Sequence, residues 1–88
     1  MALTAGQVTA NSTSAVLLHQ TDADGCDILV AADIGAGQHV CLGPAGVTTS
    51  TGYIFDGGRD IHFTMPAGSA LYVIANSGTC TVSKLVSD

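Results

Sequence analysis

The densest group of potential metal ligands in the chain lies around the segment TDADGCD and comprises four carboxylates: Asp22, Asp24, Asp27 and Asp33. A twelve-residue calcium loop takes oxygen ligands from alternate positions, glycine at the sixth position and a bidentate Glu at the twelfth. Counted from Asp22, the glycine here is the fourth residue, the fifth is Cys26, and the twelfth is an Asp. An Asp-Gly turn between two strands, formed by Asp24 and Gly25, explains the same residues without a metal. We favour the turn and keep calcium binding as the alternative.

Histidine and cysteine give a weaker metal signal. His39 and Cys41 share one face of an expected strand, but zinc sites normally show paired short spacings, which this sequence lacks. The three cysteines form an odd set with no C-x-x-C spacing, so we expect buried free thiols that pack as small hydrophobic residues. We therefore expect no metal and no cofactor.

The segment PAGSALYVIAN resembles the second metal-binding motif of cupins, a family of small β-barrel enzymes. Pro66 and Gly68 match that motif, but the metal-ligand position is Leu71, and Asn76 stands one place late. Cupins have a metal-binding histidine at that position, and without it the resemblance does not indicate a metal site or catalysis. A tight turn that enters a strand explains the proline and the glycine.

Other catalytic motifs are missing from the sequence. GPAGVTTSTG lacks the G-K-[ST] ending of a phosphate-binding loop, and no G-x-S-x-G segment is present. No serine or cysteine stands in a recognisable base context. We therefore expect neither an enzyme nor a small-molecule substrate.

The charge of the chain excludes two classes of partner. The net charge is −5, and Arg59 and Lys84 are the only basic residues. Nucleic acids and anionic membranes both attract basic clusters, so neither is an expected partner. The first fourteen residues lack the basic and apolar regions of a secretory signal, which leads us to expect synthesis in a cytoplasm.

The strand signals predict one small all-β domain. Short β-branched runs alternate with Gly, Asp, Asn and Pro turns, which favours an antiparallel β-sandwich or barrel, jelly-roll-like, of seven to eight short strands. We expect a flexible, extended N-terminal arm over residues 1–13 and a single β-sandwich domain over residues 14–88. The expected strands are Ser14–Gln20, Asp27–Ala32, Gln38–Leu42, Val47–Ser50, Tyr53–Phe55, Asp60–Met65, Ala70–Ala75 and Thr79–Val86.

Two of these strands are apolar on both faces. The runs DILVAA and ALYVIA do not alternate, which indicates burial on both sides. An 88-residue chain buries only roughly 60 to 65% of the surface of its unfolded form and has few interior strands. Two-sided burial therefore indicates cover by another subunit.

The segment LGPAGVTTSTGY, residues 42–53, resembles a pattern found in small virion proteins of tailed bacteriophages, in particular capsid decoration (cement) proteins. PAGSALYVIANSG, residues 66–78, supports the resemblance, which runs from about Ile28 to the C-terminus. The resemblance implies a non-enzymatic structural protein, commonly a homotrimer, that binds the major capsid protein of the assembled head and stabilises it. It also implies a virion location on the capsid surface. The resemblance assigns no binding residues to this chain, because the shared pattern is typical of a fold and not of a binding site.

Four large side chains are the interface candidates that we expect to pack against a neighbouring chain: Tyr53, Phe55, Met65 and Tyr72. The alternative function is a receptor- or glycan-binding module of a phage tail or fibre. For that function Tyr53 beside Asp56 is the best aromatic-acid pair, since glycan sites present aromatic platforms with nearby acids. The two functions differ in the partner that Tyr53 would contact.

Overall fold

The computed structural model describes residues 3–35, 37–56 and 60–87. Its eight elements are all strands, in agreement with the absence of helical periodicity from the sequence. The strands are β1 (Leu3–Asn11), β2 (Val16–Gln20), β3 (Cys26–Asp33), β4 (His39–Gly43), β5 (Tyr53–Asp56), β6 (Asp60–Met65), β7 (Ala70–Ala75) and β8 (Thr79–Ser87).

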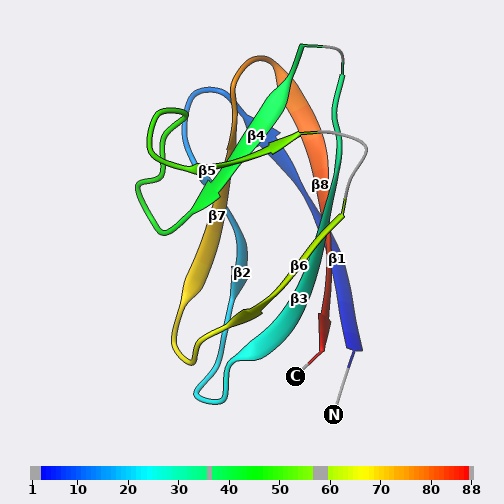
Figure 1. Ribbon diagram of the computed structural model, residues 1–88, viewed down its shortest axis with the longest axis vertical. Helices are drawn as coiled ribbons and strands as arrows, with labels where there is room; N and C mark the ends of the chain where they lie inside the picture. Colours follow the sequence, from blue (N-terminus) through cyan, green and yellow to red (C-terminus); the bar gives the residue numbers. More distant parts are fainter. Residues whose placement is uncertain (1–2, 36, 57–59, 88) are drawn as a thin grey trace.

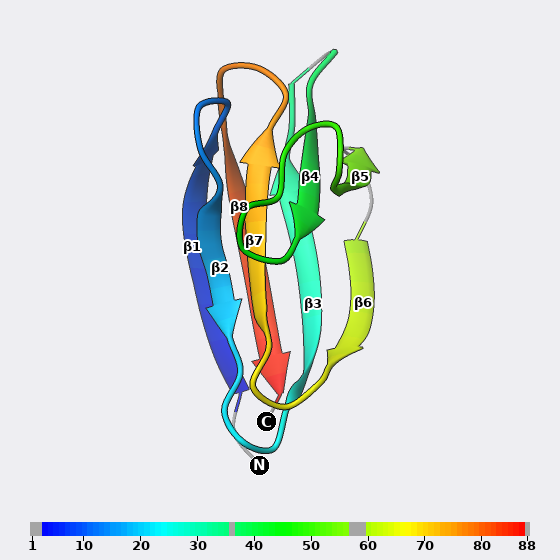
Figure 2. The same cartoon turned by 90° about the vertical axis from the view of Figure 1, so that its left-hand side faces the viewer.

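The strands form two four-stranded antiparallel sheets, packed face to face (Figure 1). Sheet A has the order β1-β8-β3-β6, and sheet B has the order β2-β7-β4-β5. Figure 2 looks onto sheet B, with sheet A behind it. The pairs β1–β8, β2–β7, β3–β6 and β4–β5 are nested, as in a long hairpin rolled into two layers. This is the strand order of a jelly roll, so the expected all-β sandwich is confirmed.

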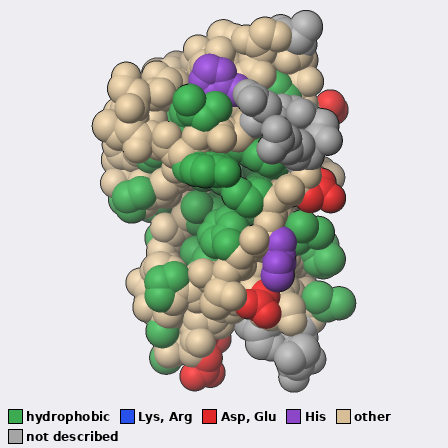
Figure 3. All heavy atoms as spheres, viewed as in Figure 1, with side chains coloured by type: hydrophobic (Ala, Val, Ile, Leu, Met, Phe, Trp, Pro, Cys, Tyr) green, Lys and Arg blue, Asp and Glu red, His purple; other side chains and the backbone are tan. Residues whose placement is uncertain are grey.

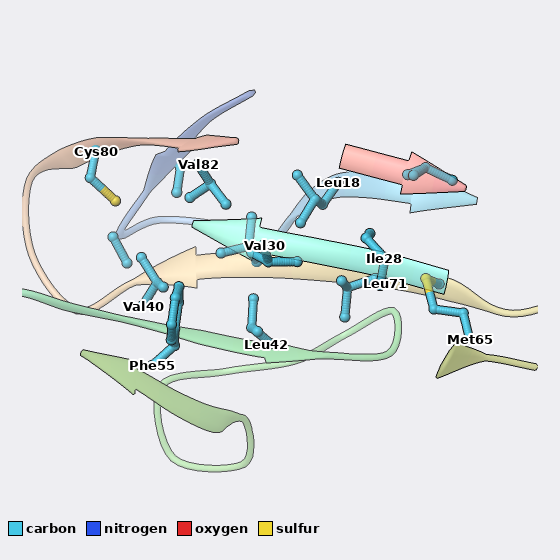
Figure 4. Packing of buried hydrophobic residues seen from close by; sticks show 14 of the residues in the cluster. Leu18, Ile28, Val30, Val40, Leu42, Phe55, Met65, Leu71, Cys80 and Val82 are labelled. Carbon is cyan, nitrogen blue, oxygen red and sulfur yellow. The ribbon is translucent and has the colours of Figure 1, made fainter. Parts of the chain in front are cut away.

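The core lies between the two sheets and is built from alternate residues of each strand. On β3, for example, Ile28 and Val30 are fully buried and face inward. Figure 4 shows how these side chains from the two sheets interdigitate. The largest fully buried side chains are Leu18, Ile28, Val30, Val40, Val73, Val82, Val86 and Cys41.

The segment in which a flexible arm was expected is instead the edge strand β1. It pairs with β8 without interruption, from Leu3 opposite Ser87 to Asn11 opposite Thr79. Its small inward-facing side chains fit the interior, since Ala10 is fully buried. An arm was expected because the first thirteen residues contain few bulky side chains. The backbone pairing with β8 leaves no sign in these residues themselves. Met1 and Ala2 lie outside the described residues.

The expected strand Val47–Ser50 does not form, because these residues belong to the loop between β4 and β5. The Thr48 carbonyl oxygen accepts hydrogen bonds from the amides of Thr51 and Gly52, and its hydroxyl accepts one from the Ser50 amide. The Thr48 amide in turn donates to the Thr51 hydroxyl. These local bonds compete with strand pairing for the same backbone groups.

The same loop, residues 44–52 and hereafter the cover loop, folds over the outer face of sheet B, where it crosses β7 (Figure 2). Val47 forms a second small core with Cys41 and Ile74. Two glycines allow the close approach. A Cβ atom on Gly52 would lie 2.6 Å from the Cβ of Cys41, and one on Gly43 would lie 2.8 Å from a Val47 methyl.

Lys84 of β8 lies on the inward face of the strand, together with Val82 and Val86. Its Nζ donates a hydrogen bond to the Leu18 carbonyl oxygen at 2.6 Å and lies 3.0 Å from Nδ1 of His19. The pairing of β2 with β7 shifts register between Leu17 and His19, which is where this carbonyl lies. Gly6, opposite Lys84 on β1, leaves room, because a Cβ there would lie 3.1 Å from Cε of Lys84. The ammonium group is thereby partly removed from the surface.

Candidate functional site

The four carboxylates of the first metal candidate do not converge. Asp27 and Asp33 begin and end the outward face of β3, six residues and therefore about 20 Å apart. The Asp22 carboxylate accepts a hydrogen bond from the Asp24 amide, as in an Asx turn, and Asp27 accepts one from the Thr64 hydroxyl. The arrangement is that of a turn between β2 and β3, and the spacing of the calcium loop is not reproduced.

No group of three or more His, Cys, Asp or Glu residues able to hold a metal occurs within residues 3–35, 37–56 and 60–87. His39 and Cys41 both lie on β4, but Cys41 is fully buried under the cover loop. Burial raises the pKa of the Cys41 thiol above its ordinary value of 9.0. A protonated, buried thiol is a poor metal ligand and a poor nucleophile.

The other cysteines are also buried. Burial, and in second place the nearby carboxylate of Asp33, raises the pKa of the Cys80 thiol. Cys41 and Cys80 carry free thiols. The expectation that the cysteines pack as small hydrophobic residues is confirmed for the side chains of all three.

The segment that resembles a cupin motif has a structural role. Leu71, at the metal-ligand position, is buried in the core. The turn before it is tied to the end of β2, because the hydroxyl of the buried Thr21 lies 3.0 Å from the Pro66 carbonyl oxygen and accepts a bond from the Ser69 amide. The turn that the proline and glycine predict is therefore present, and it closes one end of the sandwich.

The structure divides the four interface candidates into two pairs. Phe55 and Met65 are only 4% and 3% exposed and belong to the core, so neither offers a surface to a neighbouring chain. Tyr72 is half-buried beside the second small core. Tyr53 is 63% exposed. Tyr53 is thus the strongest surface candidate, and Phe55 and Met65 are corrected to core residues. The Asp56 side chain lies outside the described residues.

An apolar groove of about 350 Å³ separates β5 from β6. Its walls are Leu42, Tyr53, Ile61, His62 and Phe63. β5 has four residues and pairs only with β4, so it leaves Ile61 and Phe63 of β6 half-buried. Figure 3 shows apolar side chains gathered in this hollow on the side where β5 and β6 lie. The groove is where the two sheets fail to close on each other.

The outer face of sheet A is another surface that the described residues leave uncovered, and we call it the open face. One row of side chains crosses all four strands in register: Ala5, Leu85, Leu29 and His62. Leu85 is 42% exposed, and Leu3 at the end of β1 is more exposed still. Most other outward residues of β1 and β8 are Thr, Ser, Gln or Asn, which are short or uncharged. The face therefore has an apolar strip, formed by Ala5, Leu85 and Leu29, which ends at His62 on β6.

The surface formed by the described residues is acidic. Asp22, Asp24, Asp27, Asp33 and Asp60 are all exposed. Lys84 is the one described Lys or Arg, and it faces inward. Figure 3 accordingly shows acidic side chains and none coloured as Lys or Arg on that view. Arg59 lies outside the described residues.

Sequence reasoning missed the groove and the open face, although two signals pointed to the latter. The non-alternating run DILVAA contains Leu29, and Leu85 is the one large apolar residue on the otherwise polar side of β8. Neither signal shows that the two leucines meet, because their pairing joins strands more than fifty residues apart.

No protein-family model matches the chain, and no curated protein is similar to it in sequence. No helix long and apolar enough to cross a membrane occurs among the described residues.

Proposed function

We propose that the chain is a structural virion protein that binds the assembled phage capsid as an oligomer and stabilises it, as a decoration protein. The observation that carries the proposal is the open face, an exposed sheet face with an apolar strip, on a chain whose cover loop packs over the corresponding face of its other sheet. Exposed apolar patches bordered by polar residues mark protein contacts. The jelly roll is also an architecture of viral capsid domains.

The resemblance of residues 42–53 and 66–78 to decoration proteins supports the same function. A ligand that binds only the assembled lattice stabilises it by mass action. Several linked copies gain avidity, so each contact can be weak. For self-association, the edge strand β5 presents Tyr53 and Ile54, both more than half exposed. We propose that β5 contributes to the contact between subunits, most concretely in a homotrimer.

The test uses the purified chain and heads of a phage that encodes it. Native mass spectrometry is expected to show an oligomer, and cosedimentation is expected to show binding to expanded empty heads. Bound heads should withstand higher temperature or chelator concentration than bare heads. A monomer without affinity for heads would overturn the proposal.

A glycan-binding module of a tail or fibre is the second candidate, and the groove favours it. Tyr53 and Phe63 offer aromatic surface there, and His62 offers a polar ring at the rim. Binding to a glycan array that Tyr53→Ala abolishes, without affinity for heads, would select this function over the first.

A further inference from the structure

The open face combines an apolar centre with an acidic border. Leu29 and Leu85 lie side by side at its centre, on neighbouring strands. Asp27 and Asp33 lie on either side of Leu29 along β3, and Asp60 lies on β6 opposite Ala31. None of the described residues on this face is Lys or Arg. With His62 counted as neutral at pH 7, the charged side chains described on this face are therefore all acidic.

The size of the face suits a modest protein contact. Four strands spaced about 4.8 Å apart, over six residues of about 3.3 Å each, give a surface of roughly 400 Å². A standard interface buries about 800 Å² on each partner. One copy therefore binds weakly through this face alone, and several linked copies bind well.

A second copy of the chain is a poor occupant. If two open faces met about a two-fold axis with their β3 strands antiparallel, Asp27 of one copy would approach Asp33 of the other. Like charges placed together in an interface oppose association. An occupant with Lys or Arg around an apolar centre instead places opposite charges beside all three carboxylates.

We infer that the open face docks a partner protein whose contact surface has an apolar centre bordered by Lys or Arg. The inference rests on the proposed function only for the identity of the partner, which under that function is a surface of the capsid lattice. Apolar burial at Leu29 and Leu85 supplies affinity, and the carboxylates supply orientation and rate of association.

The direct test uses a designed β-hairpin peptide with Leu and Val on one face and Lys at the border of that face. Titration into the ¹⁵N-labelled protein is expected to shift the amide signals of β3 and β8. Affinity is expected to fall about tenfold in the double variant Leu29→Ser/Leu85→Ser, which corresponds to a loss of about 1.4 kcal/mol. It is also expected to fall as salt rises, because salt screens exposed charges.

Two controls make the result specific. Leu17→Ser removes a side chain that is 43% exposed, as Leu85 is 42% exposed, from β2 in sheet B and is expected to leave the affinity unchanged. A peptide with Glu in place of Lys is expected not to bind. Equal binding of both peptides, or shifts confined to other strands, would overturn the inference. So would concentration-dependent shifts of β3 and β8 without peptide, which would make a second copy the occupant.

Phage heads separate this inference from the proposed function. If wild type and Leu29→Ser/Leu85→Ser bind heads equally, the inference fails and the decoration function stands. If the peptide maps to the open face but the chain binds no heads, the decoration function fails and the docking surface stands. Thermal unfolding of each variant verifies that it is folded before binding is measured.

Discussion

Ile74 and Leu85 occupy matching positions on the two sheets, yet Ile74 is 7% exposed and Leu85 is 42% exposed. Each points outward from an interior strand, β7 in sheet B and β8 in sheet A. The difference comes from the cover loop, which packs Val47 against Ile74. Nothing among the described residues lies over Leu85 in the same way.

The comparison shows that two-sided apolar strands in a small domain have two different explanations. For ALYVIA, the chain itself supplies the cover, so the expectation of cover by another subunit is unnecessary there. For DILVAA, the outward residues Leu29 and Ala31 stay half-buried in the single chain. An apolar run on β3 that its own chain does not cover is consistent with a partner.

The largest expected loss of stability is that of Ile74→Ala, which is compared with the matched truncation Leu85→Ala. We expect Ile74→Ala to lower the free energy of unfolding by about 3 kcal/mol, within the range for large-to-small changes at buried sites. Leu85→Ala should lower it by about 1 kcal/mol, because much of that side chain is already in water. Urea unfolding measures both. Equal losses would show that the two faces are covered alike.

A smaller loss should follow from lifting the cover loop. In Gly52→Ala the new Cβ would lie 2.6 Å from Cβ of Cys41 and 2.7 Å from a Val47 methyl, so the loop must shift. We expect a loss of about 2 kcal/mol, typical of overpacking. We also expect faster reaction of the Cys41 thiol with Ellman's reagent.

Gly35→Ala is the matched control, because its Cβ would meet Gln38 at an ordinary 3.7 Å. Its stability should stay within about 1 kcal/mol of wild type. Slow thiol reaction in Gly52→Ala would mean that the loop does not protect Cys41.

The third prediction concerns pH and compares the thiol under the loop with the one inside the sandwich. The pKa values of Cys41 and Cys80 are raised in the folded state, so folding holds both thiols protonated. Their contribution to stability is complete below pH 9 and is lost as the pH rises from there through the raised values. The free energy of unfolding should therefore fall on the alkaline side.

Asp33→Asn separates the two thiols. It should lower the pKa of Cys80, because the Asp33 carboxylate contributes to that shift, and leave the pKa of Cys41 unchanged, because burial alone raises it. Thiolate absorbance against pH in variants with a single cysteine measures each value. A change at Cys41 would contradict this assignment.

The smallest effect on stability is expected on the open face. Asp60→Lys replaces an exposed side chain and should change the free energy of unfolding by no more than about 0.5 kcal/mol. The same change should weaken binding of the Lys-bordered peptide. A large loss of stability would show that the open face has a role in folding as well as in docking.

Local sequence signals predicted much of the sandwich. Strands Asp60–Met65 and Ala70–Ala75 were predicted with their observed bounds, since turn residues flank both and alternation marks the first. Strand β1 was missed because its inward side chains are small. Its partner β8 lies more than sixty residues away, so the pairing that stabilises it leaves no local signal.

The candidate site was less accessible to sequence reasoning. Tyr53 and Phe55 lie two residues apart on β5, but one is exposed and the other buried. The difference arises because Tyr53 lines the groove between β5 and β6 whereas Phe55 packs in the core, and only the fold shows where a groove opens. The open face likewise depends on the register between β3 and β8.

The nested strand order has a consequence for synthesis. β8 lies between β1 and β3 in sheet A, so the last strand of the eight to leave the ribosome separates two of the earliest. Sheet B can assemble once β7 has emerged, whereas β1 has no partner until β8 arrives. Until then the nascent chain exposes the unpaired edges of β1 and β3. A chaperone or a translational pause acting late in synthesis would therefore protect sheet A more than sheet B.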